Sequence, residues 1–82
     1  MSHQKAVPPS SIFDLPAGET VTLSSLEGDV TIAERLMDMG LHPGVQIELV
    51  GRLPLGGPLV IRIESSFLAL REEEAQCLKI KT

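Results

Sequence analysis

The sequence predicts a small, mostly β domain in which about five short strands form a barrel, accompanied by one short helix and one helical turn. Three observations support this prediction. Apolar and polar residues alternate over several short segments, which is typical of half-buried strands. Residues that favour tight turns separate those segments. The one stretch with helical apolar spacing is barely two turns long, so it must dock on the sheet to persist.

The length of the chain, 82 residues, corresponds to one domain with a small core. Residues 1–10 are polar and contain two consecutive prolines, so we expect a flexible tail before a domain at residues 11–82. Phe13 and Phe67 are the only aromatic residues. The core must therefore consist mainly of Val, Ile, Leu and Met.

The first predicted strand follows a Pro-Gly turn at residues 15–18. It covers residues 20–23, where Val21 and Leu23 point to one face and Thr20 and Thr22 to the other. Residues 24–30 are predicted to form a polar connection to the helix.

The helix has two candidate start signals and one stop signal. Thr31 and Glu34 have the spacing of a capping box, and Asp29 is the alternative cap. Gly40 stands where a helix commonly ends in a left-handed residue. The apolar stripe that we expect to face the sheet consists of Ile32, Leu36 and Met39, with Ala33 and Met37 beside it.

The second half of the domain alternates strands with connections. A Pro-Gly turn at residues 42–45 leads into a strand whose inward residues are Val45, Ile47 and Leu49. After the longest loop, residues 51–58, the expected elements are a strand at 59–63, a hairpin turn at Ser65-Ser66, a strand at 67–70, a helical turn at 72–77 and a strand at 78–81. Small closed barrels limit exposed strand edges, and we interpret the pattern as an SH3-like barrel.

Composition argues against two functional classes. The net charge is −4, the seven basic residues are dispersed, and Tyr and Trp are absent, so nucleic-acid binding is disfavoured. No nucleophile stands beside a base in a recognisable motif, and the glycines near Pro54 lack the Lys and Ser/Thr of a phosphate-binding loop. We therefore expect no enzymatic activity.

Targeting signals and cysteine usage favour the cytoplasm. Cys77 is the only cysteine, so no internal disulfide can form, which suits a reducing compartment. The N-terminal residues lack the apolar run of a signal peptide, and no segment has the ~20 apolar residues that span a bilayer. We expect a cytoplasmic protein with no direct membrane insertion.

Potential metal ligands are few and scattered. A specific transition-metal site usually needs three or four close ligands, whereas His3 and His42 are the only imidazoles. Cys77 and the helix methionines are interpreted as core residues. We expect no required cofactor, and leave open weak surface binding of a divalent transition metal through His3 or His42, including binding that bridges two molecules.

The longest loop, residues 51–58, is the strongest candidate site. Leu53 and Leu55 flank Pro54, and they either contact a partner or fold back over the core. Arg35 and Arg71 likewise either contact an acidic partner or pair with nearby glutamates. If the barrel brings two turns together, the partner-binding surface comprises Leu41, Pro43, Arg52, Leu53, Pro54, Leu55, Gly56, Gly57 and Pro58.

Three motifs in order resemble the FeoA family. Residues 34–44 (ERLMDMGLHPG) resemble its RL-x-x-(L/M)-G-(L/F)-x-PG pattern, residues 54–58 (PLGGP) its P-(L/F)-G-D-P loop, and residues 69–75 (ALREEEA) its ALR-x-x-EA segment. Two positions depart from the pattern. Gly57 stands where the family often has Asp, which removes an acceptor, and Ser65 stands where it often has Gly, so Ser is strained if that turn needs positive φ.

The resemblance implies an SH3-like barrel and a cytoplasmic accessory role in bacterial ferrous iron uptake, in which the protein binds and modulates the membrane transporter FeoB, including its G-protein domain. The alternative is a transition-metal-binding sensor or carrier, related to the C-terminal domain of iron-dependent repressors. A module for Pro-rich peptides is disfavoured because no Trp or Tyr can line its groove. The direction of regulation and weak self-association stay open.

Overall fold

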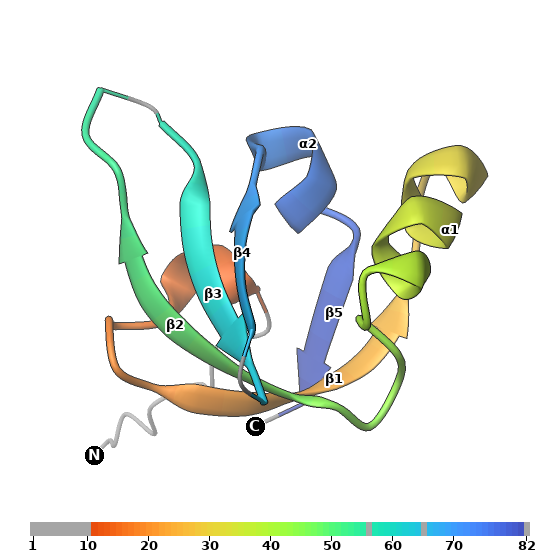
Figure 1. Cartoon of the computed structure of the whole chain (residues 1–82), viewed down its shortest axis with the longest axis horizontal. Coiled ribbons are helices and arrows are strands. Elements are labelled where there is room, and N and C mark those ends of the chain that lie inside the picture. Colours follow the sequence, from red (N-terminus) through yellow and green to blue (C-terminus); the bar gives the residue numbers. More distant parts are fainter. Residues whose placement is uncertain (1–10, 56, 65, 82) are drawn as a thin grey trace, which may run out of the picture.

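The computed structural model describes residues 11–55, 57–64 and 66–81. Five antiparallel strands form one curved sheet in the order β4-β3-β2-β1-β5 (Figure 1), which confirms the mostly β prediction. The expected tail at residues 1–10 lies outside the described residues. The elements in chain order are η1 (Ile12–Asp14), β1 (Thr20–Leu26), α1 (Val30–Asp38), β2 (Gln46–Arg52), β3 (Leu59–Ile63), β4 (Ser66–Leu70), α2 (Glu72–Ala75) and β5 (Leu78–Lys81).

Strand β1 pairs with β2 on one side and with β5 on the other. Residues 20–22 pair with β2, and residues 22–26 pair with β5, with a register shift between Leu23 and Ser25 within the β5 pairing. The prediction of a polar connection from residue 24 was therefore wrong for residues 24–26, which continue the strand. The cause is a distant partner: Ser25 and Leu26 lie opposite Lys79 and Leu78. Pairing with β5 therefore holds this segment in extended backbone, although its own sequence does not alternate.

Strand β2 is also longer than predicted. It continues to Arg52, and its pairing with β3 shifts between Leu49 and Gly51. Such a bulge adds one residue to a strand and increases its local twist. Residues 51 and 52, predicted to lie in the loop, are therefore strand residues at the base of the loop.

One hydrophobic core fills the space inside the curved sheet. The predicted inward residues of β1, β2 and β3 are buried or packed against the core, as expected. The buried residues are Ile12, Leu15, Val21, Leu23, Leu36, Leu41, Ile47, Leu49, Leu59, Ile61, Ile63, Leu70, Ala75, Cys77 and Leu78.

Helix α1 is capped at its start by Asp29 and is followed by Gly40, which stops it. The Asp29 carboxylate accepts a hydrogen bond from the Ile32 N–H at 3.0 Å, so Asp29 is the cap and the Thr31 capping box was wrong. At the other end Gly40 has φ of 102°, as predicted. Its N–H donates to the Met37 carbonyl, and the Leu41 N–H donates to that of Leu36, which together form a Schellman motif.

The apolar stripe of α1 is narrower than expected. Leu36 is 1% exposed, while Ile32, Ala33 and Met37 are half-buried. Met39 was predicted to belong to the stripe as a core residue, which was wrong, because it is 38% exposed. The reason is its position as C-cap, where φ of −87° and ψ of 3° turn the residue away from the helical path.

The C-terminal half follows the predicted order of elements. Ser66 begins β4, so it is not part of the hairpin turn as predicted, and the conformation expected at Ser65 lies outside the described residues. Glu64, just before it, has a positive φ of 48°. The predicted helical turn appears as α2, and Cys77 is buried as expected.

Candidate partner-binding surface

The connection between β2 and β3 projects beyond the sheet (Figure 1). The Leu53 N–H donates to the Pro58 carbonyl at 3.0 Å, which closes the base of the connection. The Gly57 N–H donates to the Pro54 carbonyl at 3.2 Å, which closes a tight turn at the tip. The connection is therefore a defined hairpin, although Gly56, one of the predicted site residues, lies outside the described residues.

Leu53 and Leu55 are exposed at this tip. Leu53 is 49% exposed and Leu55 is fully exposed, so neither leucine folds back over the core. Leu55 also has φ of 61°, in the left-handed region where a branched apolar side chain is rarely found. We call Leu53, Pro54 and Leu55 the leucine loop. It combines unfavourable backbone conformation with unfavourable exposure.

Gly57 keeps the two sides of the hairpin in close approach. A Cβ atom at this position would lie 2.8 Å from the Leu53 Cβ, which is too short for a real contact. The glycine that departs from the family pattern is thus required by this loop conformation. An aspartate here would displace Leu53, in addition to supplying the acceptor that glycine lacks.

Arg52, which is predicted to contact a partner, connects the base of the loop to η1. Its Nη2 donates to the Phe13 carbonyl and lies 3.4 Å from those of Ile12 and Leu15. These carbonyls belong to η1 and to its C-cap, Leu15, and that of Ile12 also accepts from the Leu15 N–H. Nothing in the sequence signalled this role, because the partners lie 37 to 40 residues earlier in the chain.

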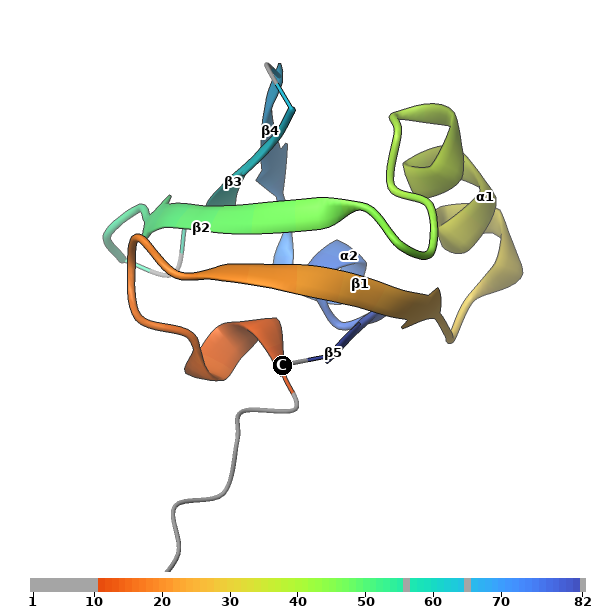
Figure 2. The ribbon, with the colours of Figure 1, turned by 90° about the horizontal axis from the view of Figure 1, so that it is seen from below.

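The turn at residues 42–44 does not join the leucine loop. The two segments lie at opposite ends of β2 (Figures 1 and 2), and a seven-residue strand separates its ends by roughly 20 Å. Leu41 is fully buried in the core, so its prediction as a partner-binding residue was wrong. Pro43 is exposed, but it is too far away to extend the loop surface.

Arg35 and Arg71 both associate with Glu74. Arg35 Nη1 lies 4.0 Å from a Glu74 carboxylate oxygen, and the Arg71 N–H donates to the other oxygen at 2.8 Å. The Arg35 side chain is mostly exposed, and exposed pairs of this kind contribute roughly 0–1 kcal/mol. The pairing alternative therefore accounts for Arg35, whereas Arg71 contributes its backbone to the start of α2.

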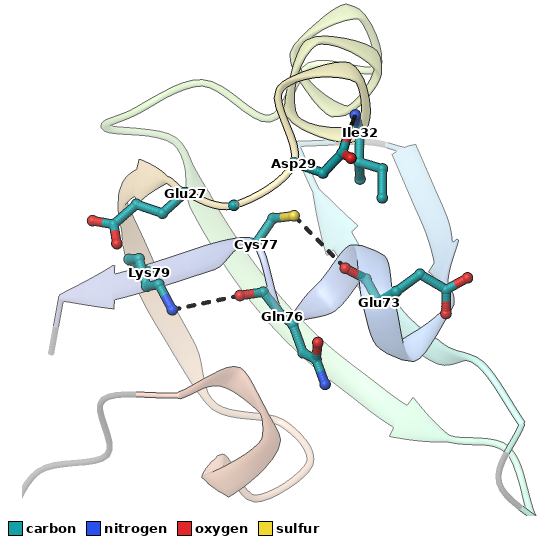
Figure 3. A pocket seen from close by; sticks show the side chains of 8 residues that line it. Glu27, Asp29, Ile32, Glu73, Gln76, Cys77 and Lys79 are labelled. Carbon is teal, nitrogen blue, oxygen red and sulfur yellow. Dashed lines mark hydrogen bonds between the residues drawn. The ribbon is translucent and has the colours of Figure 1, made fainter.

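A groove of about 480 Å³ lies between α1, α2 and β5 (Figure 3). Figure 3 shows Glu27, Asp29 and Glu73 pointing in different directions around it, with the buried Cys77 at its floor. Cys77 Sγ lies 3.6 Å from the Glu73 carbonyl, and Lys79 Nζ lies 3.5 Å from that of Gln76. These contacts are internal to the fold.

No group of three or more metal-ligand side chains comes together within residues 11–55, 57–64 and 66–81. His42 is exposed in the turn before β2. His3, the other candidate ligand, lies outside the described residues. Weak surface binding of a metal ion through these histidines stays a prediction.

The fold and the leucine loop together define a small β-barrel domain that presents an apolar hairpin, with helix α1 docked on the opposite end of the sheet. Residues 11–82 match the FeoA domain family, and the chain belongs to that family. The family is associated with ferrous iron transport. Among curated proteins, no sequence matches the chain significantly.

Solved structures agree with this assignment. Iron(II) transport protein A of Clostridium thermocellum is 32% identical over 87% of this chain and 44% of its own, with a TM-score of 0.79. FeoA of Stenotrophomonas maltophilia, an SH3-domain protein complexed with zinc, is 25% identical over 89% of this chain and 91% of its own, with a TM-score of 0.75. The SH3-like prediction is thus confirmed.

A manganese-dependent transcriptional repressor has the same fold in part of its chain. It is 18% identical over 94% of this chain and 38% of its own, with a TM-score of 0.77. This likeness concerns the fold alone. In the part of the chain that the structure describes, no helix is long and apolar enough to cross a membrane.

Proposed function

We propose that this protein is a cytoplasmic accessory factor of bacterial ferrous iron uptake that binds the cytoplasmic region of a FeoB transporter through the leucine loop. The family supplies the transport context, and the S. maltophilia relative is described as a candidate ferrous iron transport activating factor. The proposal for this chain depends on one observation: a fully exposed leucine held in a left-handed conformation.

That observation supports binding for two physical reasons. Backbone strain at a non-glycine residue is concentrated at functional sites, because elsewhere it only lowers stability. Buried apolar anchors supply much of the energy of small interfaces. Pro54 and the two closing hydrogen bonds also hold the loop in place before binding, which reduces the entropy lost in a complex.

Replacing both leucines by serine tests the proposal. The double variant Leu53→Ser, Leu55→Ser should bind the purified cytoplasmic region of a FeoB transporter at least about tenfold more weakly, measured by calorimetry, because both anchors are lost. Val30→Ser is the matched control, since Val30 is also exposed but lies at the start of α1. Parental affinity in the double variant, with an unchanged melting temperature, would contradict the proposal.

A further inference from the structure

The two edges of the sheet are protected to different degrees. Strand β5 forms one edge and carries Lys79 and Lys81, and its pairing with β1 contains a register shift. Lysines and bulges are the usual means by which proteins keep an edge from pairing with another chain. Strand β4 forms the other edge and reads SFLAL, with no charge, no proline and an unbroken register against β3.

The open edge of β4 directs backbone groups outward. Ile63 pairs with Ser66 across a two-residue connection, and such a connection closes on a hydrogen-bonded pair. Pairs then alternate along the ladder, so the N–H and C=O groups of Phe67 and Ala69 point away from β3. Both side chains are exposed, Phe67 at 65%. Within the described residues, β4 has no strand on that side.

The charges around β4 indicate what could pair with it. The strand is neutral and Glu64 precedes it. Arg71, Glu72 and Glu73 follow it, so two carboxylates outweigh one guanidinium at that end. The nearby guanidinium of Arg62, opposite Phe67 in the register, already donates to Glu48 at 2.9 and 2.6 Å. An extended segment with basic residues at both ends would therefore meet acidic groups at both ends of β4.

A second copy of the chain fits this edge less well. With Leu68 on a two-fold axis, Glu64 of one copy would lie opposite Glu72 of the other, and like charges directly opposite destabilise a ladder. Each copy also has a net charge of −4.

We propose that the β4 edge binds an extended segment of a partner protein, apolar in the middle and basic at both ends, as an added antiparallel strand. Strand addition takes its affinity from main-chain hydrogen bonds and its specificity from alternate side chains. Phe67 and Ala69 supply the main-chain groups, and the flanking glutamates select the charge of the segment. This inference stands apart from the function of the leucine loop.

A synthetic peptide tests the inference without any transporter. The probe has Val-Thr-Val-Thr-Val flanked by one lysine on each side, and its matched control has glutamate in both flanking positions. Nuclear magnetic resonance of the whole chain should show that the lysine peptide shifts the amide signals of Phe67 and Ala69 and slows their exchange. The glutamate peptide should bind at least about tenfold more weakly, because both its ends meet like charge.

Two variants of the edge complete the test. Ala69→Pro removes an outward N–H without removing a β3–β4 hydrogen bond and should abolish peptide binding, whereas Ala69→Ser should bind like the parent. Should Ala69→Pro unfold, Phe67→Lys serves instead, because it places a charge of the peptide's own sign on the edge.

Absence of shifts at Phe67 and Ala69 at millimolar peptide would overturn the inference. So would equal binding of both peptides, or shifts that grow with protein concentration alone, which would identify a second copy as the occupant. The Leu53→Ser, Leu55→Ser variant should bind the peptide normally. Loss of transporter binding in that variant tests the leucine loop, and loss of peptide binding in the edge variants tests β4. The two hypotheses can therefore fail independently.

Discussion

Gly40 and Gly44 share a left-handed backbone but differ in what surrounds them. Their φ angles are 102° and 97°. A Cβ at Gly40 would lie 3.1 Å from Ile63 Cδ1, whereas a Cβ at Gly44 would meet nothing within 4 Å. Gly40 thus serves both the end of α1 and the contact between α1 and β3, while Gly44 serves only its turn.

Alanine at each glycine separates these two roles. Gly44→Ala should lower the free energy of unfolding by on the order of 1 kcal/mol, through backbone strain alone. Gly40→Ala should lower it by more, because Ile63 must also move. Urea denaturation of both variants measures the difference. Equal losses would mean that the Ile63 contact adjusts without cost.

Leu55 is the residue at which we expect stability and binding to oppose each other. Asparagine tolerates the left-handed region far better than leucine, so Leu55→Asn should raise the free energy of unfolding by about 1 kcal/mol. The same change should weaken transporter binding by removing an anchor. Denaturation and calorimetry on one preparation test both effects, and a destabilised variant would show that the leucine side chain has a packing role.

At the scale of elements, the docking of α1 depends on Leu36. The helix is too short to persist alone, and Leu36 is its one buried residue. Leu36→Ala should therefore lower the free energy of unfolding by about 2–5 kcal/mol, since it leaves a cavity in the core. Met39→Ala, at an exposed position, is the control and should cost far less. A Leu36→Ala variant that melts with the parent would disprove this docking.

Arg52 of β2 adds side-chain hydrogen bonds to η1, which also buries Ile12 and Leu15 in the core. Replacing Arg52 by methionine removes the donor to the η1 carbonyls and should lower stability by about 1–3 kcal/mol. Hydrogen exchange of the Asp14 and Leu15 amides should accelerate more than that of the β3 amides. Arg35→Met, which loses only an exposed ion pair, should show neither effect.

Across the whole molecule, the sequence predicted those elements that are determined by a pattern of neighbouring residues. Alternation located β3 and the cores of β1 and β2, and a glycine located the end of α1, because each depends on a few consecutive residues. The second half of β1 depends on β5, more than 50 residues later, and the role of Arg52 depends on η1. Neither leaves a local signal.

The candidate site was predicted in part for the same reason. Exposure of the leucine loop followed from its Gly and Pro content and holds in the structure. The prediction that Leu41 and Pro43 lie near the leucine loop was wrong, because the two segments lie at opposite ends of β2. Loop composition carries no information about that geometry.

For the whole molecule we also predict no tight metal site in the monomer. Calorimetric titration with zinc should detect no site of submicromolar affinity, because no three ligands converge in the part of the chain that the structure describes. The experiment uses the full chain, so that His3 is included. One zinc ion bound per monomer at submicromolar affinity, and lost in His42→Ala or Cys77→Ala, would contradict this prediction.

The pairing of β1 with β5 brings the beginning and the end of the described chain to the same side of the barrel, where η1 also contacts β5 (Figure 2). A domain with adjacent ends can be joined to other polypeptides at either end, or inserted into a loop of one, without distorting its sheet. The C. thermocellum protein and the repressor, each more than twice the length of their matched region, contain this barrel within longer chains. Adjacent ends therefore allow the whole barrel to be joined to another polypeptide as one unit.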